Sequence, residues 1–171
     1  FKKFLGSSTK SIVRSVDVPC LVIKSNTKVV DFRHILLPTD LSNDSKKHID
    51  KMHSLFPTSR IELLHSYFVP FEGRLSFYGL EKGEAVLFQD NIREAALEQA
   101  YNFYNSLSID TEKVNISVIH EGLYPEAFIQ EADKLMCDLI ALHTTGNFSF
   151  FAFDLLEHAD KNILITRIDQ T

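Results

Sequence analysis

The sequence predicts an α/β protein built on a doubly wound, five-stranded parallel sheet. From Phe32 onward, segments with strand and helix patterns alternate, beginning and ending with a strand. The strand cores "HILL", "DLIAL" and "ILIT" are apolar on both faces, which is typical of strands covered by helices on both sides of a parallel sheet. Because parallel crossovers are right-handed, the ligand crevice of such a sheet is expected at the carboxyl ends of its strands.

Composition and charge exclude several classes of protein. With 171 residues, the chain has room for one ordinary domain and a further remnant. The formal net charge of −5 argues against a general nucleic-acid binder, which needs a basic face. No apolar run is long enough to span a bilayer, and "FKKFLGSS" lacks the apolar core of a signal peptide. We expect a soluble, cytoplasmic protein without nucleic-acid or membrane partners. Cys20 and Cys137, in or beside apolar runs, are expected to be reduced thiols.

The opening segment predicts one helix and one strand. Apolar residues recur at helical spacing in 8–16, and Pro19 ends that helix. The apolar run "CLVIK" at 20–24 predicts a short strand. Residues 25–31, "SNTKVVD", are polar and predict a linker.

The elements from residue 32 onward follow from the same two periodicities. Apolar runs predict strands at 32–38, 60–68, 113–122, 137–146 and 162–168. Helical spacing predicts helices at 44–55, 84–107, 125–135 and 153–160. The apolar face of the first of these carries Ile49, Met52, His53 and Leu55. That of the second, the longest, carries Leu87, Ile92, Ala96, Ala100, Phe103 and Leu107.

Two features stand out between these elements. Pro125 is well placed at the start of its helix, where a missing N–H costs nothing. Residues 69–83 contain three glycines and a proline and predict an irregular connection. It is longer than the usual ~2–6 residues, which indicates a functional or mobile segment.

The chain also contains a partial repeat, because its opening helix and strand correspond to its last helix and strand. Five stretches resemble the universal stress protein family, and together they cover most of the chain: "FLGSSTKSIVRSVDVPCLVIK", "HILLPTDLS", "IELLHSY", "VIHEGLYPEAFIQEADKLMCDLIALHTTG" and "ILITR". The chain is similar to a tandem member of this family. Residues 1–24 then correspond to the terminal helix and strand of a preceding domain, 25–31 to a linker, and 32–171 to a complete universal stress domain.

The resemblance implies a Rossmann-like sheet of order 3-2-1-4-5 and a role in stress response. It also implies that two domains or two subunits pair through their fifth strands. An uncovered edge strand invites aggregation. We therefore expect 20–24 to form an extra antiparallel edge strand against 163–167, and the partner to be a second copy, a sister universal stress domain or an unknown protein.

Family members that bind ATP resemble one another at two places, and this chain departs from the second. The first is the turn after the first strand, where Pro38, Thr39 and Asp40 stand. The second is a loop of the form G-x2-G-x9-G-[ST], whose glycines let backbone N–H groups approach phosphates. Gly146 matches its first glycine, but Ser149 stands at the second, and the terminal Gly-Ser pair is absent.

Residues Gly6, Ser7 and Ser8 match the missing Gly-Ser element, but they belong to the other copy, so neither copy holds a complete site. They also fit a simple helix N-cap. A domain with an altered nucleotide pocket remains an alternative, with ATP or AMP as ligand. Its contacts would come from Pro38, Thr39, Asp40, His65, Thr145 and Gly146.

Two of these features also have structural interpretations. Asp40, with Ser42 and Asn43, fits the cap of the following helix as well as it fits a ligand contact. The aromatic cluster from Phe148 to Phe153 fits a core or a contact with a partner domain better than a ligand pocket.

A metal site is a further hypothesis. His65, His120 and His143 fall near the carboxyl ends of three strands, and Asp40 follows a fourth; together they could bind zinc or another transition metal. Hydrogen-bonded structural histidines are the alternative. No nucleophile elbow, P-loop or dinucleotide fingerprint is present, so the sequence indicates no catalytic residues and no firm cofactor. We expect a stress-response binding protein, degenerate for ATP, that acts through domain pairing or partner contact.

Overall fold

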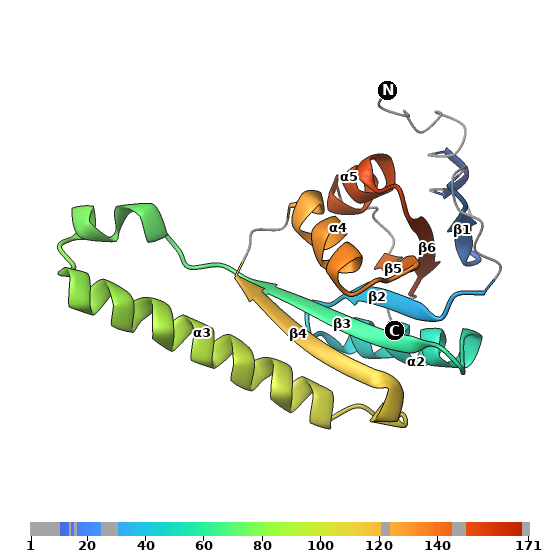
Figure 1. Ribbon diagram of the computed structural model, residues 1–171, viewed down its shortest axis with the longest axis horizontal. Helices are drawn as coiled ribbons and strands as arrows, with labels where there is room; N and C mark the ends of the chain where they lie inside the picture. The colour runs from blue at the N-terminus through green and yellow to red at the C-terminus, as the bar shows by residue number, and fades with distance from the viewer. Residues whose placement is uncertain are drawn as a thin grey trace.

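The fold is organised around one six-stranded sheet. The computed structural model describes residues 11–13, 15, 17–24, 31–120, 124–144 and 150–168. The strands are β1 (Cys20–Val22), β2 (His34–Pro38), β3 (Arg60–Tyr67), β4 (Val114–His120), β5 (Leu139–Thr144) and β6 (Asn162–Arg167). Their order is β1-β6-β5-β2-β3-β4, and every pairing is parallel except that of β1 with β6 (Figure 1). This confirms the predicted fold class and the order 3-2-1-4-5 with an added edge strand.

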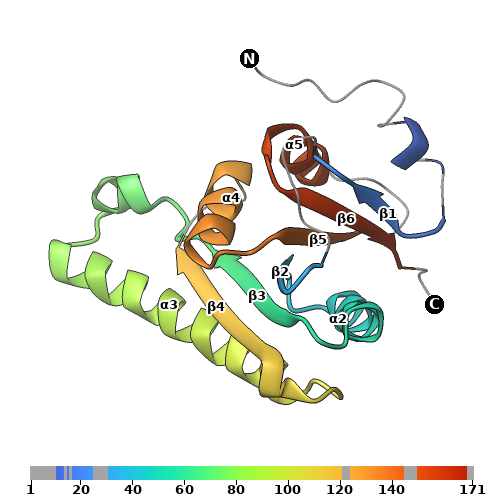
Figure 2. The same ribbon diagram turned by 45° about the vertical axis from the view of Figure 1, so that its right-hand side comes forward.

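Helices cover both faces of the sheet. The helices are α2 (Asn43–Leu55), α3 (Lys82–Asn105), α4 (Pro125–Lys134) and α5 (Phe150–His158), with short 3-10 turns η1 (Glu72–Tyr78) and η2 (Thr111–Lys113). Helices α2 and α3 lie on one face and α4 and α5 on the other (Figure 2). Alternate residues of the central strands therefore point into two separate cores. Leu36 and Ile140 pack with α4 and α5, while Ile35 and Leu37 pack with α2 and α3.

Local sequence explains where the helices begin. Ser42 caps α2 by accepting a hydrogen bond from the backbone N–H of Ser45. Glu81 and Glu84 form a reciprocal capping box at the start of α3. Pro125 is the first residue of α4, as predicted. No helix in the described part of the chain is long and apolar enough to cross a membrane.

Three predictions about the helices need correction. The connection 69–83 is not wholly irregular, because it contains η1 and the start of α3. Helix α5 begins at Phe150, three residues before the predicted start, because the aromatic residues there are helical and not part of a loop. Leu87 and Leu55 do not face the core; they are 63% and 48% exposed.

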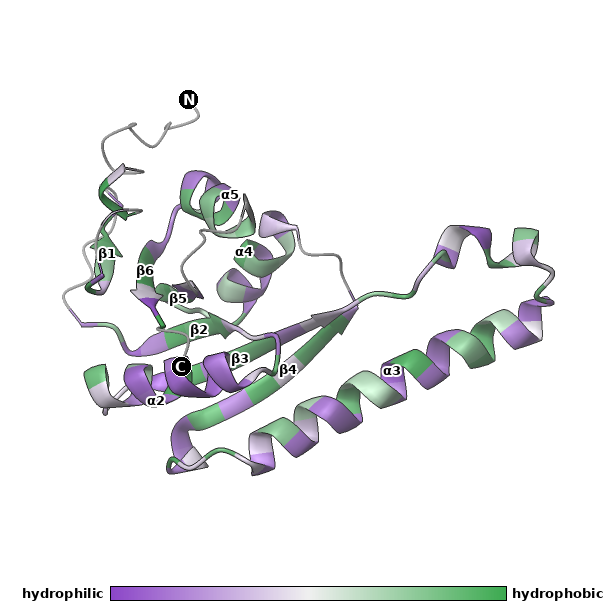
Figure 3. Cartoon of the chain, turned by 180° about the vertical axis from the view of Figure 1, so that it is seen from behind, coloured by the Kyte–Doolittle hydropathy of each residue, from purple (hydrophilic) through white to green (hydrophobic). Residues whose placement is uncertain are grey.

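Helix α3 is only partly packed against the sheet. Its buried residues are Ala96, Ala100 and Phe103, which all lie in its C-terminal half. Its first half extends beyond the strands and mixes hydrophilic and hydrophobic residues around the helix (Figure 3). The predicted 3.6-residue spacing therefore identifies a core face only where the sheet lies beneath the helix.

The edge strand β1 pairs antiparallel with β6, as predicted. Cys20 lies opposite Ile165, Leu21 opposite Leu164 and Val22 opposite Ile163. The strand has three residues and not the predicted five. Beyond its end, the backbone N–H of Lys24 donates to the side-chain oxygen of Asn162 at 3.0 Å. The segment thus covers the backbone edge that β6 would otherwise present to solvent.

A buried histidine joins helix α2 to strand β6. His48 Nδ1 lies 2.8 Å from the hydroxyl oxygen of Thr166 on β6, and both side chains are buried. Burial, and after it the nearby His143, lowers the pKa of His48 to about 3, against a smaller opposing effect of the Ala141 backbone. His48 is therefore neutral at ordinary pH.

Both cysteines are free thiols in this structure, as predicted. Cys137 is buried beside β5, and burial together with the charge of Glu62 raises its pKa to about 12. Because the thiolate is the reactive form, Cys137 is a packing residue and not a nucleophile.

Removing the edge strand should change the association state. We expect deletion of residues 1–24, and more mildly Val22→Pro, to produce aggregation or a new dimer, since proline cannot donate to a ladder. Val18→Pro, which lies before the strand, is the matched control. Sedimentation velocity measures the outcome. If the deleted chain and Val22→Pro sediment like the parent, the edge-closure account is wrong.

Replacing His48 should flatten the acid dependence of stability. Because its pKa in the folded state lies below the value of 6.5 for a free imidazole, the unfolded chain takes up the proton first. Stability contributed by neutral His48 is present above pH 6.5 and is lost as pH falls toward 3, by about 1.4 kcal/mol per pH unit. When the free energy of unfolding is measured with urea at several pH values, its slope against pH should be smaller by that amount in His48→Gln than in the parent. His53→Gln, on the same helix, should keep the steep slope; equal slopes for all three proteins would contradict the assignment.

Candidate functional site

A cavity opens at the carboxyl ends of β2, β3 and β5, where the sequence predicts the ligand crevice. Its volume is about 430 Å³. Four of the six predicted nucleotide contacts, and one further predicted histidine, line it: Pro38, Thr39, Asp40, His65 and His143. The structure therefore brings these residues together. Thr145 and Gly146, like Gly6, Ser7 and Ser8 of the partial phosphate motif, lie outside the described residues.

The turn between β2 and α2 is fixed by its own side chains. The Thr39 backbone N–H donates to the Leu64 carbonyl at 2.9 Å, which continues the pairing of β2 with β3. The Thr39 hydroxyl oxygen accepts from the backbone N–H of Leu41 at 3.1 Å. Leu41 has φ of 63°, a left-handed conformation that is rare for a branched residue. These bonds hold the sharp bend that directs the chain into α2.

Asp40 is engaged in the same turn. Its Oδ1 accepts from the backbone N–H of Ser42 at 3.0 Å and from the hydroxyl of Ser45 at 2.7 Å. Burial alone would raise the pKa of Asp40, but the hydrogen bonds from Ser42 and Ser45 outweigh it, and the pKa is lowered. The structure thus supports the capping interpretation: Asp40 is a charged carboxylate whose oxygen is already used by α2.

His65 also has a structural partner. Its Nδ1 lies 3.1 Å from the Thr39 carbonyl oxygen. Because a carbonyl only accepts, this nitrogen carries the proton. His65 is therefore held against the same turn through Nδ1. A ligand in the crevice would meet its other ring nitrogen, Nε2.

His143 brings a second imidazole close to His48. The two ring centroids are 5.1 Å apart. Burial lowers the pKa of His143, and the charges of Asp40 and Asp44 only partly offset that effect. The crevice therefore places the neutral imidazole of His143 beside the carboxylate of Asp40.

The proposed metal ligands do not assemble. His120 is stacked on Tyr67, with ring centroids 5.0 Å apart, and its Nε2 lies 3.2 Å from a carboxylate oxygen of Glu72. It does not line the crevice with His65, His143 and Asp40. Among the described ranges, no group of three or more His, Cys, Asp or Glu residues could hold a metal ion. The four-residue set is thus not a site here, because β4 carries His120 beyond the crevice.

The sequence did not indicate the apolar wall of the crevice. Phe68, Phe128 and Phe151 line it together with Leu142. The rings of Phe128 and Phe151 pack edge to face with centroids 4.9 Å apart. Phe151 belongs to the aromatic cluster that was interpreted as core or partner contact; it is partly buried against the core and also lines the crevice, whereas Phe153 of the same cluster is buried. Phe128 is a core position of α4, and nothing in its local pattern points to a cavity.

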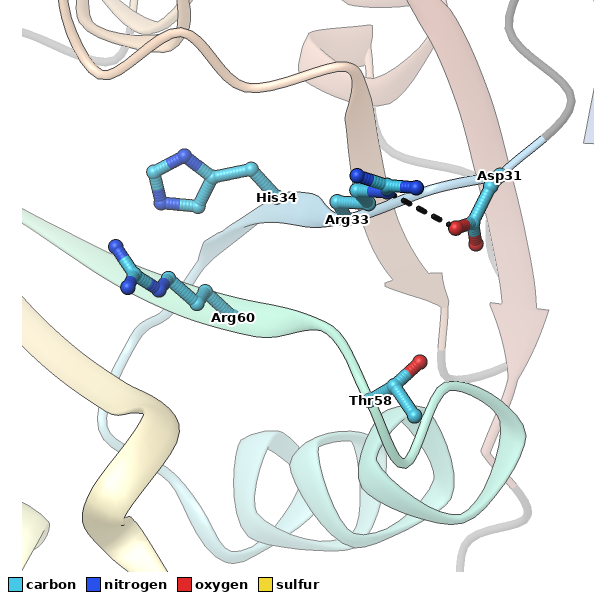
Figure 4. Close-up of a pocket in the computed structure, with 5 residues that line it drawn as sticks. All are labelled: Asp31, Arg33, His34, Thr58 and Arg60. Atoms are coloured by element: carbon cyan, nitrogen blue, oxygen red, sulfur yellow. Dashed lines mark hydrogen bonds and ion pairs between the residues drawn. The ribbon is translucent and has the colours of Figure 1, made fainter.

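A larger open hollow lies at the opposite, amino end of the strands. Its volume is about 640 Å³, and it is lined by Asp31, Arg33, His34, Thr58 and Arg60 (Figure 4). The Arg33 guanidinium turns toward Asp31, at 3.0 Å, and away from His34 and Arg60 (Figure 4).

Beneath this hollow, another carboxylate is satisfied by its neighbours. His34 Nε2 lies 3.1 Å from Glu62 Oε1, which also accepts from the Asn115 amide at 2.8 Å. Two of the basic side chains at this end are therefore paired within the protein. The crevice remains the better candidate site.

Comparison with known proteins rests on structure alone, because no family model matches the sequence and no curated protein is similar to it. A functionally unknown protein from Pseudomonas aeruginosa is 13% identical, with a TM-score of 0.64 over 97% of this chain and 58% of its own. A universal stress protein from Archaeoglobus fulgidus is 11% identical, with a TM-score of 0.61 over 95% and 54%. A universal stress family protein from Burkholderia pseudomallei is 17% identical, with a TM-score of 0.52 over 80% and 96%.

The chain spans little more than half the length of the Pseudomonas and Archaeoglobus proteins. At these sequence identities the comparisons establish the fold alone. The chain therefore has the fold of the universal stress proteins.

Proposed function

We propose that this chain is a tandem member of the universal stress protein family and acts in stress response as a regulatory binding protein. In this proposal its domain, residues 32–171, is degenerate for ATP binding and acts by pairing with another universal stress domain or by contacting a partner protein. Support comes from the fold and from the sequence stretches that resemble the family.

The chemistry of the crevice is the observation that carries the proposal. Among the described residues that line it, no lysine or arginine is present. The one carboxylate, Asp40, is held in its charged form, and His143 has a lowered pKa and carries no positive charge. A triphosphate needs cationic or backbone N–H donors, and here it would meet a negative charge and aromatic rings. This environment disfavours ATP.

The edge of the sheet supports the pairing role. In the proposal, 1–24 is the terminal helix and strand of a preceding domain, and 25–31 is the linker. The antiparallel ladder between β1 and β6 then joins the fifth strands of two domains. The two longer structures align with nearly all of this chain, whereas the shorter Burkholderia structure leaves about a fifth of it unmatched. That difference fits an opening segment contributed by a second domain.

A second candidate is a nucleotide-binding domain with an altered pocket. The observation that favours it is the crevice itself, since Pro38, Thr39, Asp40 and His65 line a cavity of about 430 Å³. Its aromatic wall suits a flat base better than phosphates. The two candidates differ in whether ATP or AMP binds at all.

Titration with ATP and AMP distinguishes them. Calorimetry at millimolar nucleotide should give no saturable heat, and the melting temperature should not rise, because ligand binding to the folded state alone would raise it. An ATP-binding universal stress protein, run in parallel, shows that the assay detects binding. Saturable heat with either nucleotide would refute the degenerate-site proposal and establish the altered pocket.

A further inference from the structure

A separate cavity of about 480 Å³ is lined by residues of α2 and of the C-terminal half of α3. It shares Asp40 and His65 with the crevice, but its other walls are different. Leu41 and Phe103 contribute apolar surface, and Lys46, Gln99 and Asn102 contribute polar groups. This cavity differs from the crevice in having a lysine and two amide side chains among its lining residues, so it suits a different ligand.

Lys46 is positioned by an aromatic ring and not by an acid. Its ammonium lies 5.6 Å from the centroid of the Phe103 ring, within the range of a cation–π contact. Within the described chain it has no carboxylate at ion-pair distance. The neighbouring Lys47, by contrast, pairs with Asp44 at 3.3 Å. The charge of Lys46 is thus held at the cavity wall and left available.

Neutral hydrogen-bond donors line the same cavity as this charge. Gln99 and Asn102 are three residues apart on α3, which places them on one face of the helix, and both line the cavity. Each amide offers two N–H donors. Ser106 also lines the cavity, but its hydroxyl already donates to the Phe103 carbonyl at 2.6 Å. One cation and two amides match the two oxygens of a carboxylate.

Asp40 limits the charge that this cavity accepts. Its carboxylate borders the cavity, and its lowered pKa keeps it negative. A doubly charged phosphate would be repelled more strongly than a singly charged carboxylate. The apolar surface of Leu41 and Phe103 suits a short carbon chain. We propose that this cavity binds small organic monocarboxylates, with Lys46 as the charge partner and Gln99 and Asn102 as hydrogen-bond donors.

The site is distinct from the proposed function, since it requires neither domain pairing nor the absence of ATP binding. The site and the crevice share Asp40 and His65, but their other lining residues differ. If butyrate does not bind in the test below, the result of the ATP titration is unaffected. If ATP binds, the result of the butyrate titration is likewise unaffected.

NMR titration of the full chain with butyrate tests the proposal. The side-chain amide signals of Gln99 and Asn102 should shift and saturate at millimolar butyrate. n-Butylammonium, with the same chain and the opposite charge, should not shift them, and inorganic phosphate should bind more weakly than butyrate. A lack of saturation, or tighter binding of phosphate, would overturn the proposal.

Charge-matched variants then locate the site. Lys46→Gln should weaken butyrate binding by at least about tenfold, because it removes a charged hydrogen-bond donor. Lys47→Gln removes the same charge from the neighbouring position, where Lys47 pairs with Asp44 at the surface. It should change butyrate binding by less than about twofold. Asn102→Asp, at an exposed position, should abolish binding with the fold retained. Equal weakening by Lys46→Gln and Lys47→Gln would show only a general attraction to the surface.

Discussion

The two hydrogen bonds accepted by Asp40 connect the middle of the sheet to its first helix. They come from Ser42 and Ser45, and they hold the turn in which β2 becomes α2. The same turn presents the Thr39 carbonyl to His65. Because Asp40 and His65 border both cavities, this turn determines the shape of each. It also engages one oxygen, Oδ1, of the carboxylate that borders both cavities.

The two sides of the turn differ in charge for physical reasons. On the crevice side, burial leaves His143 and His48 neutral, and aromatic rings form the wall. On the α3 side, Lys46 is close to Phe103 and still reaches solvent. Universal stress folds place their crevice at the ends of parallel strands, but residue chemistry decides what enters. Here the absence of lysine and arginine from the described lining of the crevice disfavours polyphosphates, as the proposed function requires.

The fold could be predicted almost fully from sequence, while the site could be predicted only in part. Strand cores such as "HILL" and "ILIT" are buried on both faces, so their pattern is unambiguous, and the pairing of 20–24 with 163–167 follows from the edge they leave. Helix faces were less certain, because the first half of α3 has no sheet beneath it and Leu87 is exposed. The positions of Asp40, His65 and His143 at strand ends correctly predicted that they lie in one cavity. The places of Phe128, Lys46 and Gln99 in the cavity walls depend on how the helices pack across the sheet, and no local sequence pattern encodes that packing.

The central claim is that the Asp40 carboxylate serves the α2 turn and does not face bound phosphates. NMR observation of its side-chain carboxyl carbon during an acid titration, with and without magnesium ATP, tests this claim most directly. The account predicts a pKa below the ordinary aspartate value, unchanged by the nucleotide. Nearby phosphate charge would raise that pKa. A pKa that rises when ATP is added, or one above the ordinary value without it, would contradict the account.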